Sequence, residues 1–249
     1  MKNWYVHRRT CPTVRFTFGV VVVAIGSLIS QNSARAIVIV PAPSGTTTVT
    51  PTNLPGGLPA GLPAGDVYIP GAFETEPFTG YNAQSQIVFE GTVTSMVYAD
   101  PAEPSFAGNP AGLDFVYQLS NNNDSMTPDD AIDRLTISSF ATFQTDVDYL
   151  GGTGNVAPTT ADRSSIPGTI VGFNFPVGAM VAVGQNTDYL VVETDATIYV
   201  QGTAAVIDGG SGSTHSDAPV TATVLTVPEP ATFGLLAVVG GMLLGRRRR

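Results

Sequence analysis

Short runs of alternating apolar and polar residues, separated by turn residues, fill the chain from about residue 66 onward. The alternation is clearest at residues 113–119, where Leu113, Phe115, Tyr117 and Leu119 would share one face of a strand. Similar runs lie at 87–98, bent near Gly91, and at 135–143, 169–175, 189–194, 197–206 and 220–227. No apolar repeat of 3.6 residues is sustained, so the pattern predicts strands rather than helices.

The spacing of these runs predicts one all-β domain over residues 66–226. Glycine, proline, asparagine and aspartate are concentrated between the runs, at 151–154, 176–178, 185–188 and 208–212, where we expect turns or loops. About seven or eight short strands with such punctuation favour an antiparallel β-sandwich of the jelly-roll or immunoglobulin-like kind. The order of the strands does not follow from this pattern.

Residues 37–65 precede this domain and differ from it in composition. From 41 to 65 the chain is uncharged and rich in proline, glycine and threonine, and Gly-Leu-Pro-Ala occurs twice in succession from Gly57. Frequent prolines fix φ and remove amide donors, which predicts a semi-rigid, extended linker. The alternative is a segment ordered along an edge of the domain.

The first 36 residues have the three parts of a secretory signal peptide. An apolar run at 16–29 separates the small-residue motif of Ala34 and Ala36 from a basic start that contains Lys2, Arg8, Arg9 and Arg15. A helix of this length, at about 1.5 Å per residue, is shorter than the roughly 30 Å hydrocarbon core of a membrane. We therefore expect signal peptidase to cut after Ala36, so that the mature chain begins at Ile37. An uncleaved N-terminal anchor is the alternative.

Residues 227–249 form a second segment directed to a membrane. The triplet Pro228, Glu229 and Pro230 precedes an uncharged run at 231–245, and the chain ends in Arg246, Arg247, Arg248 and Arg249. We expect the uncharged run to form a short transmembrane helix. Arginines are costly to move across a bilayer, and this sets its orientation. Its arginine end would stay in the cytoplasm as a stop, and the triplet would lie outside. A simple C-terminal tail anchor is the alternative.

The triplet, the apolar run and the arginine cluster together resemble the PEP-CTERM sorting signal of Gram-negative and related bacteria. The resemblance implies that exosortase, a membrane-embedded cysteine transpeptidase, recognises the tail and cuts near the triplet. It also implies export in a system that makes extracellular polysaccharide. A weaker similarity to the uncharacterised cargo domain of many PEP-CTERM proteins covers 115–119, 133–136, 143–149, 162–165, 171–175 and 189–197. No activity is established for that cargo, so the resemblance locates the protein and leaves its activity open.

Charge is segregated along the sequence. The formal net charge is −9, yet all 20 acidic residues lie between Asp66 and Glu229. Over that body, Arg134 and Arg163 are the only cations, so two positive charges against 20 negative ones leave −18. Nucleic-acid binding through phosphates depends on lysine and arginine and is excluded, whereas divalent cations would be attracted. We expect each of the two arginines to find a carboxylate and form a fixed internal ion pair that joins loops, rather than to bind an anionic ligand.

The sequence gives little support for a catalytic site. His215 is the single histidine after residue 36 and lies in a glycine- and serine-rich stretch that we expect to be a solvated loop, without a G-x-S-x-G elbow. The one cysteine, Cys11, lies in the signal peptide, so neither a disulfide nor a zinc site is expected in the mature chain. With so many acids, some pair meets glycosidase spacing by chance. We therefore expect no enzymatic activity, no catalytic residue and no resident cofactor.

Oxygen-rich clusters suggest one metal hypothesis. Calcium prefers carboxylate and carbonyl oxygens, and its candidate ligands are Asp124, Asp129, Asp130, Asp133, Asp146 and Asp148. None of these fits the spacing of an EF-hand loop. Turn caps and solvated acids are the alternative interpretation.

These patterns predict an exported, non-enzymatic protein of the cell envelope or extracellular matrix. It would be anchored first in the inner membrane and processed by signal peptidase and exosortase. A carbohydrate- or calcium-binding extracellular module, with extracellular polysaccharide as a partner, is the alternative. In that case the aromatic residues Tyr68, Phe73, Tyr81 or Tyr149 would form an exposed platform.

Overall fold

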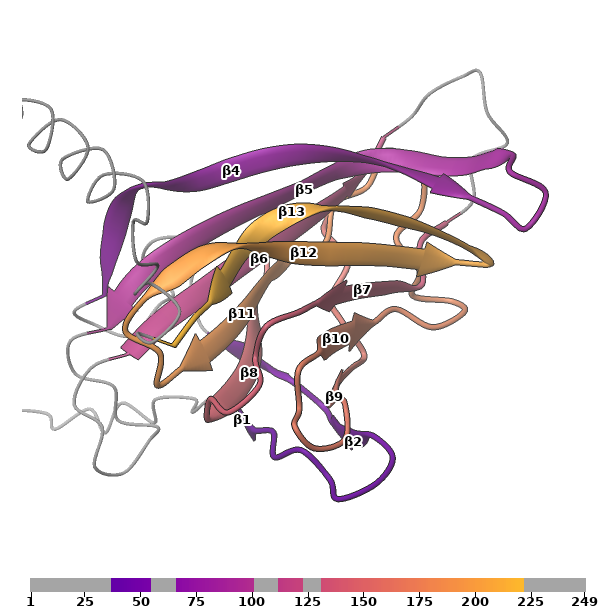
Figure 1. The fold of residues 1–249 in the computed structure, drawn as a ribbon. Coiled ribbons are helices and arrows are strands. Elements are labelled where there is room, and N and C mark those ends of the chain that lie inside the picture. Colours follow the sequence, from indigo (N-terminus) through magenta and orange to yellow (C-terminus); the bar gives the residue numbers. More distant parts are fainter. Residues whose placement is uncertain (1–36, 55–65, 101–111, 123–130, 222–249) are drawn as a thin grey trace, which may run out of the picture. The chain divides into compact units, whose positions relative to one another are not determined.

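A computed structural model of the chain describes residues 37–54, 66–100, 112–122 and 131–221. Within these ranges the regular secondary structure consists of β-strands (Figure 1), so the all-β prediction is confirmed. The predicted signal peptide and the predicted sorting tail lie outside the described residues.

Thirteen strands follow one another along the chain. They are β1 (Ile37–Val38), β2 (Thr47–Val49), β3 (Thr52–Leu54), β4 (Val67–Tyr81), β5 (Ile87–Asp100), β6 (Gly112–Asn121), β7 (Arg134–Ile137), β8 (Thr145–Leu150), β9 (Thr160–Arg163), β10 (Val171–Asn174), β11 (Tyr189–Thr194), β12 (Tyr199–Asp208) and β13 (Gly210–Pro219).

Hydrogen bonding connects the strands in the order β1-β8-β11-β6-β5-β4-β13-β12-β7-β10-β9-β2, and β3 pairs separately with β8. All pairs are antiparallel except β3 with β8. β4 and β13, at the middle of this order, share one paired position, Tyr81 with Ser211. We call this contact the thin junction. We call the strands from β1 to β4 in this order the first half, and those from β13 to β2 the second half.

One hydrophobic core draws on both halves. Phe115, Val147 and Leu190 of the first half belong to the same buried cluster as Leu135 and Phe173 of the second half. Each fully buried side chain of this kind stabilises the fold by about 1.5–3 kcal/mol relative to an exposed one. Packing between the halves, rather than the thin junction, therefore holds them together.

The sandwich prediction is met in part. The antiparallel pairing is confirmed, and β12 and β13 run alongside β4 and β5 (Figure 1). The strands do not form two separately hydrogen-bonded sheets, because the pairing of Tyr81 with Ser211 joins the two halves into one continuous strand order.

Residues 37–54 differ from the predicted linker. β1 pairs with β8 at one end of the strand order, β2 pairs with β9 at the other end, and β3 returns to β8. The prolines of this stretch lie between the short strands, at Pro41, Pro43 and Pro51, where a missing amide donor breaks no pairing. This part of the predicted linker is instead the ordered edge segment named as the alternative.

β13 corrects a second expectation. The stretch around His215 was expected to be a loop, yet Gly210–Pro219 is a strand paired along its whole length with β12. The glycines that suggest a loop are required by close approach: a Cβ at Gly212 would lie 2.7 Å from the carbonyl oxygen of Thr79. Gly209, with φ of +57°, makes the tight turn between the two strands.

Candidate functional site

Three aspartates converge where β4 begins, β5 ends and β6 begins. Asp66 directly precedes β4, Asp100 is the last residue of β5, and Asp114 lies near the start of β6. The antiparallel pairing of these strands brings the three together, and one carboxylate oxygen from each lies within 4.8 Å of the others. Asp100 and Asp114 are buried, at 1% and 0% exposed.

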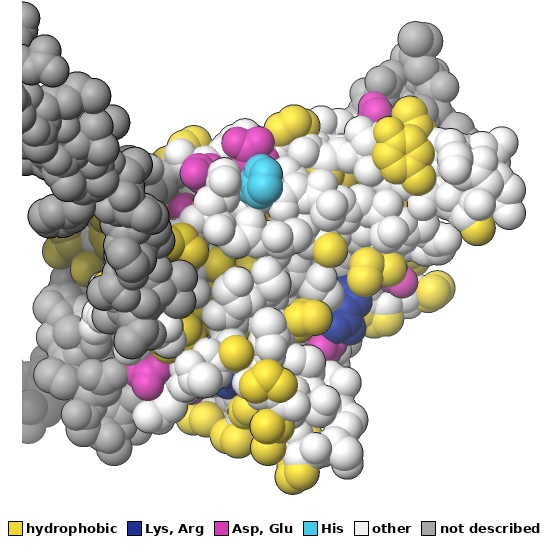
Figure 2. Space-filling view, viewed as in Figure 1, with side chains coloured by type: hydrophobic (Ala, Val, Ile, Leu, Met, Phe, Trp, Pro, Cys, Tyr) yellow, Lys and Arg dark blue, Asp and Glu magenta, His cyan; other side chains and the backbone are white. Residues whose placement is uncertain are grey.

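This donor set fits a hard divalent cation. Three carboxylate oxygens are the ligands that calcium prefers, and backbone carbonyls or water would complete its six to eight positions. Three buried negative charges so close together are costly unless protons or a cation balance them. Figure 2 shows that basic side chains take up little of the visible surface of the described residues.

Acidic residues continue from this cluster across the first half. Glu193 of β11 lies opposite Asp114 on one side and opposite Asp146 of β8 on the other. Directly opposed residues point to the same face of a sheet, so the three carboxylates form a row. Glu193 and Asp146 are both buried, at 3% and 1% exposed. We call this set, with Asp66 and Asp100, the acidic face.

The predicted calcium ligands are not brought together as one group. Asp146 and Asp148 lie two residues apart on β8 in the first half, whereas Asp133 immediately precedes β7 in the second half. Asp124, Asp129 and Asp130 lie outside the described residues.

Asp148 lies in a setting that perturbs its pKa. It is fully buried, and its Oδ1 accepts a hydrogen bond from the amide of Thr52 at 2.9 Å. Burial raises the pKa of Asp148 to about 7, and the charge of Asp146 adds to the rise. Asp148 therefore titrates near neutral pH.

A second polar cluster joins the two halves at Asp217 of β13. The Asp217 carboxylate accepts from the hydroxyl of Ser95 at 3.2 Å, and its backbone carbonyl accepts from the hydroxyl of Tyr117 at 2.8 Å. Burial, followed by the charge of Glu74, raises the pKa of Asp217 to about 6. Burial also raises the pKa of Tyr117 well above its usual value. The cluster links β5 and β6 to β13.

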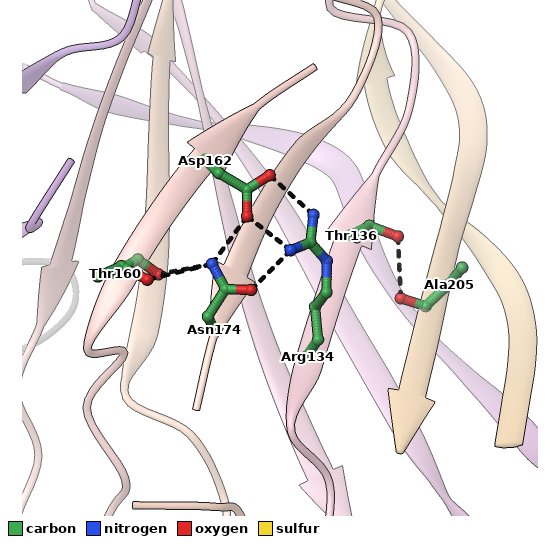
Figure 3. Close-up of polar contacts among 6 residues, drawn as sticks. All are labelled: Arg134, Thr136, Thr160, Asp162, Asn174 and Ala205. Carbon is green, nitrogen blue, oxygen red and sulfur yellow. Dashed lines mark hydrogen bonds and ion pairs between the residues drawn. The ribbon is translucent and has the colours of Figure 1, made fainter. Parts of the chain in front are cut away.

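Arg134 forms the predicted internal ion pair (Figure 3). Its guanidinium donates to both carboxylate oxygens of Asp162, at 2.6 and 2.7 Å, and to the amide oxygen of Asn174 at 2.7 Å. The Asn174 amide nitrogen donates to Asp162 at 2.8 Å and so closes the network. The pair joins neighbouring strands of the second half, β7, β10 and β9, rather than loops.

Arg163 differs from the expectation that each arginine finds a carboxylate. It is 1% exposed, and burial lowers its pKa. Its guanidinium donates instead to four backbone carbonyls, those of Gly168, Ile39, Phe140 and Phe143, at 2.7–3.1 Å. Arg163 therefore fastens the N-terminal segment to β9 and to the turn that follows β7.

The aromatic residues named for a platform do not form one group. Tyr68 and Phe73 of β4 are 37% and 56% exposed and lie opposite Tyr98 and Met96, so they share one face. Tyr81 is at the other end of β4, and Tyr149 packs against the core.

The sequence patterns did not predict the cluster of Asp66, Asp100 and Asp114, because the three aspartates are widely separated along the chain. Pairing was the available signal: Asp66 and Asp100 occupy facing ends of consecutive strands, β4 and β5. His215 is exposed on β13 rather than in a loop.

The residues predicted for processing lie outside the described part of the chain. These are Ala34, Ala36, Pro228, Glu229, Pro230 and Arg246 to Arg249. Among the described residues, no helix has the length and apolar character needed to cross a membrane.

Comparison with known families identifies the tail. Residues 226–249 match the PEP-CTERM protein-sorting motif, which covers the triplet, the apolar run and the arginine cluster. The resemblance proposed for this segment is therefore confirmed, and it indicates an exported protein that exosortase sorts through a C-terminal membrane-anchoring signal. No curated protein and no solved structure matches the chain.

Proposed function

We propose that this exosortase substrate is a non-enzymatic structural protein of the cell envelope or extracellular matrix. The observation that carries the proposal is the PEP-CTERM motif at residues 226–249, because it assigns the chain a route out of the cell. The rest of the mature chain is the exported cargo domain. Its role depends on the surface that it presents outside the cell.

The proposed route has four steps. The chain is exported, signal peptidase cuts after Ala36, and the tail is arrested in the inner membrane with its arginines in the cytoplasm. Exosortase then recognises Pro228, Glu229 and Pro230 and releases the body or transfers it to the cell surface. The arginine cluster supports this orientation, and the small residues Ala34 and Ala36 support the first cut.

A structural role is supported by how the body uses its polar side chains. Arg134 and Arg163 hold strands and turns together, and Asp217 ties one half to the other. We further propose that the two halves, although joined at Tyr81 and Ser211, pack face to face as in a β-sandwich of jelly-roll or immunoglobulin-like kind, a form supported by the single core that they share.

Mass spectrometry of both termini of the surface-exposed protein tests the route. We expect an N-terminus at Ile37 and a C-terminus near Pro230, with the arginine cluster removed. Replacing Pro228, Glu229 and Pro230 by alanine should leave the protein in the membrane with Arg249 intact. Glu76→Gln, a change on β4 far from both ends, is the matched control and should be processed normally. A surface-exposed wild-type chain that still ends at Arg249 would refute the proposed sorting.

A calcium-binding extracellular module is the second candidate, favoured by the convergence of Asp66, Asp100 and Asp114. Calorimetry with calcium should show binding to the wild type, and millimolar calcium should raise its melting temperature. A ligand at 100 times its Kd adds about 2.7 kcal/mol to the free energy of unfolding. Asp114→Asn should lose the effect, and Glu76→Gln should keep it. No heat of binding and an unchanged melt in calcium and in chelator would eliminate this candidate.

A further inference from the structure

The nitrogen of Ile37, where the mature chain is proposed to begin, points at β8. Ile37 is the first residue of β1 and lies opposite Val147. Two residues later, the amide of Ile39 donates to the carbonyl of Thr145 at 2.9 Å. Hydrogen-bonded positions recur at every second residue of an antiparallel pair, so the nitrogen of Ile37 also faces β8, at the level of Val147.

The edge of β8 beyond Val147 is already occupied. β3 begins there, with Thr52 beside Asp148 in a parallel pairing. A continuation of β1 backwards from Ile37 would need the place on β8 that Thr52 fills, because antiparallel partners advance one residue at a time. Thr52 therefore fills the place on β8 next to the one that pairs with Ile37, the residue that the Ala34 and Ala36 motif predicts as the first of the mature chain.

Two buried carboxylates flank this point. Asp146 and Asp148 share one face of β8, each about 3.3 Å along the strand from Val147. Oδ1 of Asp148 is bound by the amide of Thr52. Oδ2 of Asp148 is buried and has no hydrogen-bond partner among the described residues. Buried carboxylate oxygens normally have a donor, so Oδ2 marks a place for one.

The charged groups around Asp148 do not supply that donor. Glu193 on β11 faces Asp146 and adds negative charge, and β3 contains no titratable side chain. Arg163 contacts Ile39, the residue that follows β1, but its guanidinium donates to the carbonyl of Ile39 and to three further carbonyls. In a setting this rich in acid, an ammonium group is the donor that would be favoured most.

We propose that the α-ammonium group created at Ile37 by signal removal binds Asp148 and so fastens the mature N-terminus to β8. The inference rests on the proposed cleavage after Ala36. In that hydrolysis the bond between the Ala36 carbonyl carbon and the Ile37 nitrogen breaks. The hydroxyl of water goes to the carbon and its hydrogen to the nitrogen, and the new carboxylic acid passes its proton to the amine. The resulting ammonium has donors for the carbonyl of Val147 and for Oδ2 of Asp148.

The sequence allows a direct test, because its single lysine is Lys2. After cleavage, the amino group of Ile37 is the one primary amine in the protein. The mature protein is purified from an exporting host, its N-terminus is identified by mass spectrometry, and its rate of acetylation by acetic anhydride is followed against pH. We expect the folded protein to react about tenfold more slowly than the unfolded one near pH 7, with its pH midpoint moved up by about one unit. Simple shielding of the amine would slow the reaction without moving the midpoint.

Three variants locate the partner. Asp148→Asn should return the midpoint to that of the unfolded chain, and Glu76→Gln, four strands away from β8 in the strand order, should not change it. A glycine inserted between Ala36 and Ile37 moves the amine by about 3.3 Å and leaves every native residue in place, so it should also return the midpoint to that value.

The possible failures are distinct. A mature chain that begins at another residue overturns the proposed cleavage and this inference together. A chain that begins at Ile37 but whose amine titrates alike in the folded and unfolded states keeps the cleavage and overturns the ion pair. An insertion variant with an unchanged, raised midpoint also overturns it.

Discussion

The two arginines of the body show how a single side chain can hold distant segments together. Arg134 is 30% exposed at its side chain and satisfies its charge with Asp162. Arg163 is almost completely buried and satisfies four backbone carbonyls from separate segments. Both residues stand out in the sequence as lone cations, but only the fold shows that Arg163 binds carbonyl groups.

Replacing Arg163 should therefore cost more stability than replacing Arg134. Arg163→Met leaves buried carbonyls without donors, and we expect the free energy of unfolding to fall by about 3–5 kcal/mol. Arg134→Met breaks a partly exposed pair, and a loss of about 1–2 kcal/mol is expected. Urea unfolding of both variants measures the difference. Equal losses would contradict the role assigned to Arg163.

Asp217 should make stability depend on pH. Its pKa is raised to about 6 in the folded state, so the folded state binds its proton more tightly than the unfolded state does. Its contribution to stability is therefore fully present below about pH 4 and is lost as pH rises to about 6.

Asp217→Asn removes this titration and can still accept from Ser95. Relative to the wild type, the variant should gain up to about 3 kcal/mol in the free energy of unfolding between about pH 4 and pH 7. Denaturant unfolding across this range tests the sign and the size of the gain. Glu76→Gln serves as the matched control. A stability difference that stays constant with pH would rule out this account.

At the scale of the element, sequence patterns predict strands well where burial is apolar. β6 and β11 lie where alternating or continuous apolar runs predict strands. β8 was missed because Asp146 and Asp148 occupy positions where a buried strand normally carries apolar residues. β13 was missed because its glycines are typical of loops. The three-aspartate cluster depends on pairing between strands, which no local pattern contains.

Gly212 tests the reason given for the composition of β13. Gly212→Ala places a Cβ 2.7 Å from the carbonyl oxygen of Thr79, at the thin junction of β4 and β13. We expect a loss of about 1–3 kcal/mol in the free energy of unfolding, as for other overpacked sites. Ser213→Ala, at the exposed neighbouring position, should change stability little. If thermal unfolding of Gly212→Ala matches that of Ser213→Ala, close approach is not the reason for glycine here.

At the scale of the whole molecule, charge separates the two ends of the chain from the body between them. The cations are concentrated at the ends, whereas the acids lie between Asp66 and Glu229. The negative charges of this body repel one another, and the acidic face places several of them on neighbouring strands. Screening by salt and binding of a divalent cation would both relieve this repulsion, but only the second needs a defined set of ligands.

The two effects separate when salts are compared at equal ionic strength. Sodium chloride should raise the melting temperature gradually from about 10 mM to 0.5 M, because the Debye length falls below about 10 Å above 0.1 M. Calcium chloride at matched ionic strength should raise it further if Asp66, Asp100 and Asp114 bind the ion. Asp114→Asn should then remove the additional rise while keeping the response to sodium chloride. Identical curves for the two salts in the wild type would mean that the acidic face responds to screening alone, and a melt insensitive to both would mean that its charges are already balanced inside the fold.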